Sequence, residues 1–450
     1  MALSTLDVLC CRITIGDEDP ANPMNILHGI EIHEVQALEI HESYKKLIGT
    51  AKLKFPRGTL FRSTILGSVT REGKDASRLT AEIMQNGALI EKRSAQGVLD
   101  ANVIKVEQRI NIKLGYNGVL KTLFDGYVTA YNSDSIFEIE CENMAHKLKL
   151  KQAPKFETPA SGVSVNDILG KKYGVLKDTG FDIHSDTKRF NIQIGKIKIT
   201  DNFTVADILS EWSKYKVYCF LKYDADSPSS MPTIAIGRPY SSSKAQPVFP
   251  HDKAAEMPYK VYFNHHVAHS DLKIVKTNPR FLAVTGKALG SDEKFFEVTV
   301  RLNPEYDSKD KDSKEFQIVN ATQISTKTHK ITGNTTATGA ATKTKVDLST
   351  YTVVPYMSPN MRIDSDKLVE ETIEYFRNYN LNGITGNLTL FGDLALTTAV
   401  QVELIDDRNP SKNGVYIVED VTTTFGVNGY RQKITVPYRL NSKSKDIESK

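Results

Sequence analysis

The sequence predicts a predominantly β fold of the α+β class, in which two β-rich regions flank a small mixed α/β region. Three observations indicate this arrangement: short alternating segments fill the first third of the chain, two capped helices begin near residues 164 and 204, and strand-like segments resume after residue 250. The 450 residues are 40% hydrophobic, which is enough to bury several cores. We therefore expect two to four domains.

Charge, hydropathy and cysteine spacing argue against several classes of protein. The net charge is only +4, and Lys and Arg are balanced by Asp and Glu almost everywhere, so no segment has the basic density of a nucleic-acid-binding surface. Residues 1–16 lack the cationic region and cleavage pattern of a signal peptide, and no segment is long and apolar enough to span a bilayer. The four cysteines, at 10, 11, 141 and 219, have no metal-ligand spacing. We expect a cytoplasmically made protein without a disulfide framework.

The first region alternates with the period of a β-strand. Between Val35 and Phe55, apolar residues such as Leu38 and Ile40 alternate with polar ones, and the pattern predicts two half-buried strands. A second alternating run at residues 110–114 enters the turn Gly115-Tyr-Asn-Gly118 and leaves it towards 123–128, which is typical of a hairpin. Residues 137–141 alternate again. These segments predict an antiparallel sheet.

The mixed region changes to a helical period. Ser164-Val-Asn-Asp-Ile-Leu169 and Thr204-Val-Ala-Asp-Ile-Leu209 are near copies, and each has a capping hydroxyl three residues before an Asp. After Thr204 the apolar residues recur at 205, 208, 209 and 212, a stripe that should pack against a sheet. A strand at 217–222 follows, so the sequence predicts two helix-plus-strand units.

The last region returns to strands. We expect them at 259–263, 272–275, 281–285 and 295–300. Residues 303–351 are rich in Ser, Thr, Lys and Asp, and they predict a long loop or insertion, either a recognition loop or a passive solvated one. An amphipathic helix at 364–376 precedes strands at 386–393, 400–404, 414–418 and 429–436, which indicate a closed or nearly closed antiparallel sheet.

Candidate chemistry is sparse. His265, His266 and His269 are a candidate metal cluster, because His265 and His269 would share a face on a helix, but the flanking residues favour strands or a turn and no nearby carboxylate pattern completes a site. Glu138 and Glu140, with Glu142, alternate with apolar residues and fit a solvated strand face better than a carboxylate site. No nucleophile elbow or phosphate loop occurs. We assign no catalytic, cofactor-binding or metal-binding residue, and we expect a binding or building module rather than an enzyme.

Read in order, several segments resemble the hub proteins of contractile injection machines. The family includes the tail hubs of T-even phages and phage Mu, the late control protein D family, and the N-terminal part of the type VI secretion spike protein VgrG. Gly115-Tyr-Asn-Gly118, followed by Leu123-Phe-Asp-Gly-Tyr-Val-Thr129, resembles a strand pair of this family. The segments at 137–141 and 204–220 are similar to its next strand and to its helix-strand unit, and 386–393, 414–418 and 425–430 to its closing barrel. The match omits 303–351 and the last ten residues.

The resemblance implies two tube-like antiparallel β-barrel domains with a small mixed α/β domain between them. Residues 1–150 would form the first barrel, completed by about 228–268, and 151–227 the mixed domain. Residues 269–440 would form the second barrel region with its insertion at 303–351, and 441–450 a charged tail.

The resemblance also implies a structural role in the virion tail baseplate, assembled in the host cytoplasm. Three copies would form a ring that joins a hexameric tail tube to a trimeric central spike, contacts other baseplate proteins and passes DNA or cargo through its channel. Little sequence follows Leu440, so the spike is expected to be another polypeptide.

Two alternatives remain at this point. One is a glycan-binding or wall-degrading tail protein, with Glu138 or Glu140 as an acid and the 303–351 segment on the glycan. The other is the hub of a long non-contractile tail. A secretion-type machine fits the resemblance as well as a phage does.

Overall fold

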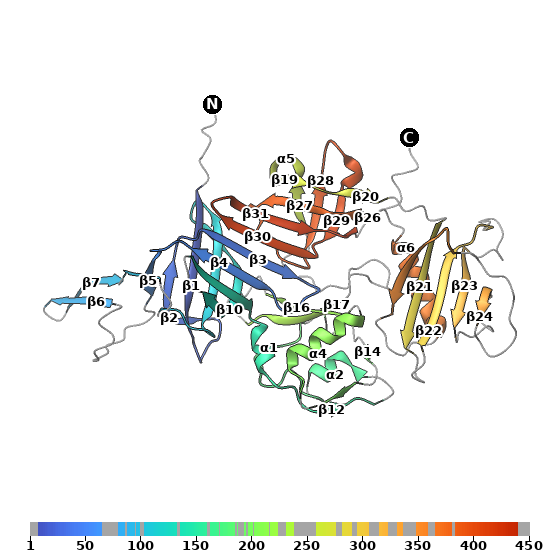
Figure 1. The fold of residues 1–450 in the computed structure, drawn as a ribbon, viewed down its shortest axis with the longest axis horizontal. Coiled ribbons are helices and arrows are strands. Elements are labelled where there is room, and N and C mark those ends of the chain that lie inside the picture. The colour runs from blue at the N-terminus through green and yellow to red at the C-terminus, as the bar shows by residue number, and fades with distance from the viewer. Residues whose placement is uncertain are drawn as a thin grey trace.

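The computed structural model describes most of the chain, shown in Figure 1. The described residues are 8–64, 80–85, 88–94, 96–99, 103–132, 136–159, 163–170, 172–184, 187, 193–194, 197–200, 202–215, 217–223, 231–237, 258–275, 281–289, 295–305, 315–322, 331–335, 348–358, 365–379 and 383–439. The predicted α+β fold, predominantly β, is confirmed. No helix among these residues is both long and apolar enough to cross a membrane.

A thirteen-stranded sheet runs through the molecule in the order β19-β27-β31-β30-β3-β4-β11-β10-β9-β1-β2-β5-β8. Nine of its strands come from the first third of the chain and constitute the first β domain. They are β1 (Leu9–Glu18), β2 (Ile26–Ile32), β3 (Ala37–Ser43), β4 (Thr50–Phe55), β5 (Leu60–Thr64), β8 (Gln96–Val98), β9 (Arg109–Tyr116), β10 (Val119–Asn132) and β11 (Phe137–Asn143). The hairpin of β6 (Thr80–Gln85) and β7 (Ala88–Ser94) is a separate two-stranded sheet.

The alternation of apolar and polar residues along the strands produces the core of this domain, as the sequence predicts. Leu38, Ile40 and Leu53 are buried, whereas Glu39 between them is exposed. The predicted turn at Gly115–Gly118 joins β9 to β10, with Asn117 and Gly118 at positive φ. One apolar cluster therefore fills the inner side of the sheet.

The second β domain supplies the other four strands of the large sheet and a smaller sheet of four. In the large sheet these are β19 (Val267–Ser270), β27 (Asn387–Phe391), β30 (Asp420–Gly426) and β31 (Gly429–Thr435); in the smaller one, β18 (Tyr259–Tyr262), β28 (Gln401–Ile405), β29 (Gly414–Ile417) and β32 (Tyr438–Arg439). A short helix, α5 (Phe263–His266), joins β18 to β19. Figure 1 shows β30 and β31 lying alongside β3.

The seam between the two β domains is a regular antiparallel ladder. Strand β3 pairs with β30 from Ala37 opposite Gly426 to Ser43 opposite Asp420. The two domains are thus joined edge to edge by backbone hydrogen bonds, and a single sheet extends through both.

The mixed domain lies beneath the seam in Figure 1. Its helices are α1 (His146–Leu150), α2 (Val165–Leu169) and α4 (Val205–Glu211); its strands are β12 (Phe156–Glu157), β13 (Val163–Ser164), β14 (Gln193–Ile194), β15 (Lys198–Ile199), β16 (Tyr218–Lys222) and β17 (Thr233–Gly237). The capping box of α4 is present, because the Thr204 hydroxyl accepts from the Asp207 amide at 3.2 Å and Asp207 accepts from the Thr204 amide at 2.9 Å. Ser164 instead caps through the Asn166 amide. The apolar stripe that follows Thr204 is buried in this domain's core.

A fourth unit, the inserted domain, interrupts the second β domain. It consists of a five-stranded sheet and one helix: β21 (Leu282–Leu289), β22 (Phe295–Leu302), β23 (Phe316–Thr322), β24 (Ile331–Thr335), β25 (Thr352–Met357) and α6 (Ser365–Tyr379). Helix α6 packs on β21 and β22 through Leu368 and Phe376. Strands β20 (Lys273–Val275) and β26 (Gly383–Thr385) pair with each other just before and just after it. Its entry and exit are therefore adjacent, as in an inserted domain.

One sequence expectation, a long loop at 303–351, is corrected by the structure. Residues 303–351 are not one long loop, because β23 and β24 lie within them; the short alternating run at 316–322 is hidden in a polar composition. The described strands that overlap 228–268 pair outside the first β domain's own strands: β17 pairs with β16, β18 with β28, and β19 with β27. Strand pairing depends on which edges are available, and local sequence does not encode that.

Candidate functional site

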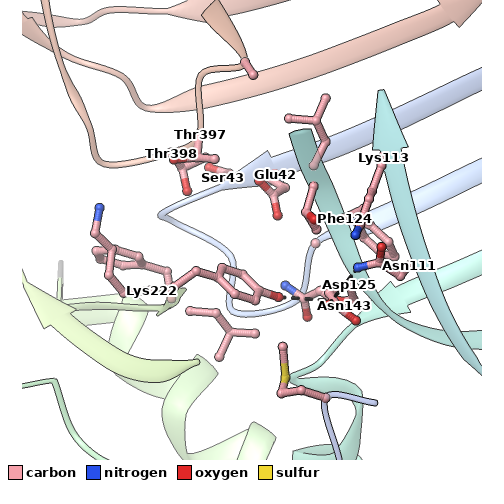
Figure 2. A pocket seen from close by; sticks show the side chains of 18 of the residues that line it. Glu42, Ser43, Asn111, Lys113, Phe124, Asp125, Asn143, Lys222, Thr397 and Thr398 are labelled. Carbon is pink, nitrogen blue, oxygen red and sulfur yellow. Dashed lines mark hydrogen bonds between the residues drawn. The ribbon is translucent and has the colours of Figure 1, made fainter. Parts of the chain in front are cut away.

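The first β domain, the mixed domain and the second β domain meet around a cavity of about 590 Å³. Figure 2 shows side chains from all three domains facing it. Strands β3, β9 and β10 contribute Glu42, Asn111 and Asp125; the mixed domain contributes Lys222, and the loop before β28 contributes Thr398. A cavity at a junction of domains is a common place for a functional site.

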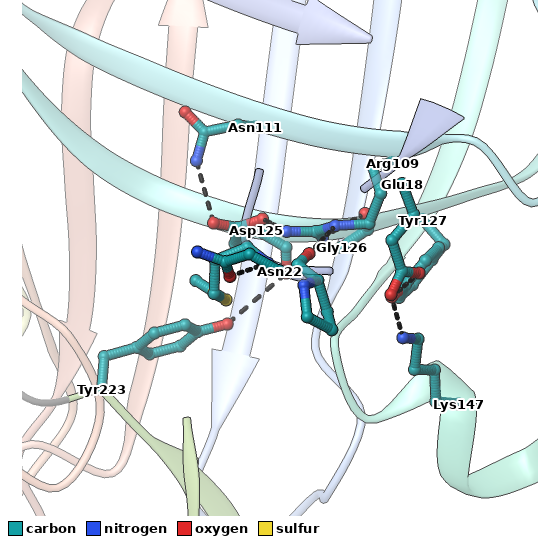
Figure 3. Close-up of polar contacts among 11 residues, drawn as sticks. Glu18, Asn22, Arg109, Asn111, Asp125, Gly126, Tyr127, Lys147 and Tyr223 are labelled. Atoms are coloured by element: carbon teal, nitrogen blue, oxygen red, sulfur yellow. Dashed lines mark hydrogen bonds and ion pairs between the residues drawn. The ribbon is translucent and has the colours of Figure 1, made fainter. Parts of the chain in front are cut away.

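A buried ion pair forms one side of this junction. Arg109 is fully buried, and its guanidinium lies 2.5 Å from the Asp125 carboxylate. The same guanidinium donates to the backbone oxygens of Pro23 and Gly126, at 3.0 and 2.8 Å, and Asn111 donates to Asp125 at 3.0 Å (Figure 3). Burial raises the pKa of Asp125, and Arg109 and Asn111 act in the opposite direction. Each of the three guanidinium nitrogens has a hydrogen-bond partner, and such partners make a buried charge tolerable.

A chain of contacts through Tyr127 connects this ion pair to helix α1. The Arg109 guanidinium lies over the Tyr127 ring at 5.1 Å, and the Tyr127 hydroxyl donates to Glu18 at 2.8 Å. Glu18 also pairs with Lys147 of α1, as Figure 3 shows. His146 lies between the carboxylates of Glu142 and Glu107, 2.8 and 3.0 Å from its ring nitrogens. These contacts hold α1, the first element of the mixed domain, against the large sheet.

A second set of contacts holds the seam. Tyr44, which is fully buried just after β3, donates from its hydroxyl to Glu419 at 3.2 Å, and Lys45 pairs with Glu419 at 2.6 Å. The Tyr44 ring also packs on Tyr218 of β16, with ring centroids 5.7 Å apart. Burial raises the pKa of Glu419, which Lys45 partly offsets. One side chain thus contacts both neighbouring domains.

Glu42 is the exception at this junction. It follows Leu38 and Ile40 on the inward side of β3, and its carboxylate is directed into the cavity (Figure 2). Burial raises its pKa to about 7. The described part of the chain gives this carboxylate no hydrogen bond and no ion pair.

Exposed apolar side chains gather at the ends of two hairpins. Val119, at the start of β10, is 70% exposed, and Val427, in the turn between β30 and β31, is 83% exposed. The two hairpins touch, because the rings of Tyr116 and Tyr430 stack at 5.5 Å. Val8 and Leu9, next to the β9–β10 turn, are exposed as well. This set of four residues, Val8, Leu9, Val119 and Val427, is called the apolar tip below.

The residues considered from sequence lie elsewhere. His266 accepts from the Tyr262 amide at 3.0 Å, while His269 pairs with Asp271 at 2.8 Å, so the histidines have separate partners. Among the described residues, no three His, Cys, Asp or Glu side chains are placed to hold a metal ion. Glu138 and Glu140 both pair with Lys52, as expected of a solvated strand face, and the pKa of Glu138 is lowered by its bonds to Lys54 and Lys52. A general acid needs the opposite shift.

The sequence contained one overlooked signal for the junction. Glu42 occupies an inward position of an alternating strand, where an apolar residue is the rule. Arg109 gave no comparable signal. The register of β9 and β10 shifts at a bulge between Thr122 and Phe124, and only this shifted register brings Asp125 beside Arg109.

Comparison with known proteins gives the following matches. No family model and no curated protein matches the sequence. Among solved structures, a tail protein from Neisseria meningitidis matches with a TM-score of 0.48 at 10% identity, over 95% of this chain and 96% of that one. The 43 kDa tail protein of prophage MuSo2 from Shewanella oneidensis matches with 0.47 at 12% identity, over 96% and 97%.

A third match is the Francisella PdpA–VgrG complex, with a TM-score of 0.44 at 11% identity, over 96% of this chain and 58% of that one. These three matches are thus a tail protein, a prophage tail protein and a PdpA–VgrG complex.

Proposed function

We propose that this chain is the structural hub of a phage tail baseplate or a related contractile injection machine. Three copies would form a ring that joins a hexameric tail tube to a trimeric central spike, and the ring would nucleate the first layer of tube subunits. The observation that carries this proposal is the β3–β30 ladder, which joins two antiparallel β domains edge to edge within one chain.

Symmetry explains why such a chain suits this place. A ring of three chains, each contributing two neighbouring β domains, contains six β domains, so it can meet a six-fold tube on one side and a three-fold spike on the other. The ladder places the two β domains of one chain side by side. Whether the two domains are equivalent to a tube subunit is the part of the proposal that the assembly experiment tests.

The ends of the large sheet are suited to contacts between subunits. Among the described strands, β8 and β19 are its two terminal strands, and each has one neighbour in the sheet. An unpaired strand edge is a template for another strand. Joining β8 of one copy to β19 of the next would be a head-to-tail contact, which forms a closed ring of three when the rotation between copies is about 120°.

The junction supports a mechanical role. A hub must keep its domains aligned while a tube passes force through it, and buried contacts resist such displacement better than surface ones. The buried Tyr44–Glu419 bond links the first β domain to the second, and the Lys147–Glu18 pair links helix α1 to the large sheet. The apolar tip would be covered in the assembly, since exposed apolar patches mark interaction sites.

Light scattering on the purified chain, alone and with its tube and spike proteins, tests the proposal. We expect a mass three times that of the 50.2 kDa chain, and short tubes on adding the tube protein. A monomer at every concentration that neither the spike nor the tube protein converts to a trimer would contradict the hub. Turnover of purified peptidoglycan is expected to be undetectable, and measurable hydrolysis would favour the wall-degrading alternative.

A further inference from the structure

Glu42 of β3 carries a further inference, which goes beyond the hub function and does not depend on it. Its carboxylate faces the cavity at the junction of the three domains, towards the side formed by Phe124 and Asp125 (Figure 2). In the described part of the chain the carboxylate has neither a hydrogen-bond donor nor an ion-pair partner. Asp125, in the same cavity, is held by Arg109 and Asn111. Asp125 is therefore paired, whereas Glu42 has no partner among the described residues.

A half-buried carboxylate that faces a cavity and has no partner is less favourable in its charged form than one in water. It either takes up a proton or acquires a positive counter-charge. The described residues provide no such counter-charge. The cavity, however, has room for a bound cation.

The other ionisable groups around the cavity do not fill this role. They are Lys46, Lys113, Lys222, Asp125, Tyr223 and Tyr259. Lys46 is exposed, and the charge of Lys113 acts on Asp125. Burial is the only cause that shifts the pKa of Glu42, which means that no neighbouring lysine compensates its charge.

The rest of the cavity suits an aliphatic body with a polar end. Leu47, Leu123 and Phe124 are apolar walls, while Asn143 and Thr398 offer hydrogen-bonding groups. A volume of about 590 Å³ lies in the range of small-molecule sites. We propose that this cavity binds a small organic cation, whose ammonium or guanidinium group pairs with Glu42 and whose alkyl body packs on Leu47, Leu123 and Phe124.

Calorimetric titration of the full chain with n-butylammonium and n-butylguanidinium tests the proposal, with n-butanol as the uncharged probe. We expect one site per chain for the cations at pH 8 and none for butanol. Affinity should fall roughly tenfold at pH 6, because a carboxyl with a pKa of about 7 is mostly protonated there. Equal affinities at the two pH values would overturn the proposal.

Two variants assign the site. Glu42→Gln keeps the shape of the side chain and removes its charge, so cation binding should weaken at least tenfold. Glu39→Gln, on the exposed face of the same strand, should leave it unchanged. Near-ultraviolet circular dichroism verifies that both variants are folded. Undiminished binding by Glu42→Gln, or no cation binding by the folded wild-type chain, would refute the site.

The cation has two sources, a free amine or a Lys or Arg side chain of a partner protein. An acetylated Gly-Lys-Gly peptide amide distinguishes them, with norleucine replacing Lys as its control. Binding of the Lys peptide that depends on Glu42 and equals that of butylammonium identifies a partner side chain. Binding of the free amines alone identifies a small ligand.

Discussion

Gly126 of β10 and Glu142 of β11 approach so closely that no side chain fits between them. A Cβ atom on Gly126 would lie 2.0 Å from the Glu142 carbonyl oxygen, far inside van der Waals contact. The Gly126 carbonyl also accepts from Arg109 at 2.8 Å. Close packing of two backbones and the buried ion pair therefore depend on the same residue.

Gly126→Val should unfold or strongly destabilise the first β domain. The Cβ would displace β11, so we expect the free energy of unfolding to fall by about 3 kcal/mol or more. Urea denaturation measures it. Gly118→Ala is the control, because its Cβ meets nothing within 4 Å and only its positive φ is unfavourable, by about 1–2 kcal/mol. Equal losses for the two variants would contradict the close approach, and normal assembly by Gly126→Val would count against this strand's place in the hub.

Arg109→Met should cost about 3–5 kcal/mol of stability, because Asp125 would remain buried without its partner. The double variant with Asp125→Asn should lose less than the sum of the two single variants, which a double-mutant cycle by urea denaturation detects. Arg12→Met removes an exposed pair with Glu31 and should cost less than about 1 kcal/mol. Additive losses would show that Arg109 and Asp125 do not interact.

Glu42→Gln should stabilise the ligand-free chain at pH 8. The carboxyl has an ordinary pKa of 4.5 and a folded pKa of about 7, so the proton is held more tightly in the folded state. The protonated carboxyl contributes its full share of the folding stability below pH 4.5, and this share is lost as the pH rises through 7. We expect the variant to exceed the wild type by roughly 1–3 kcal/mol at pH 8 and to match it near pH 5. Parallel pH profiles in thermal unfolding would refute the shift.

Gln432→Leu should destabilise the second β domain by about 2–3 kcal/mol. The fully buried Gln432 amide accepts from the Leu396 amide at 2.7 Å and donates to the Leu396 carbonyl at 3.0 Å, and leucine would leave both backbone groups unpaired. Lys433→Ala, at the next and exposed position, should change stability by less than about 0.5 kcal/mol. If both variants behave alike in urea, the amide bonds contribute little.

Removal of the inserted domain should leave the other three domains folded. Val275 and Gly383 are paired across β20 and β26, so a two-residue Asn-Gly turn can join them directly. We expect the shortened chain to be soluble, with a circular dichroism spectrum richer in strand signal per residue and a cooperative thermal transition. Aggregation of the shortened chain would indicate that the inserted domain stabilises its neighbours.

Local pattern predicted much of the secondary structure. Strands such as β3, β4, β9 and β11 follow from alternation, because a strand with one buried face has a period of two. The cap at Thr204 followed from a motif only four residues long. In these cases the stabilising contacts lie within a few residues of each other.

Most of the candidate site could not be predicted from local sequence patterns. The junction forms where residues near 42, 125, 222 and 398 meet, and their spacing along the chain carries no trace of that meeting. The single local sign was Glu42 itself, a carboxylate at an inward strand position. The cavity that it faces is formed only by the meeting of the three domains.

The sequence by itself determined that this is a strand-rich chain with a small helical region in its middle, because periodicity and caps are short-range properties. Only the tertiary structure decided that β3 pairs with β30 and that strands β21–β25 and helix α6 form a domain of their own. Many strands present the same backbone donors and acceptors at their edges. Which edges meet depends on how all the apolar faces can be buried at once, and that is a property of the whole fold.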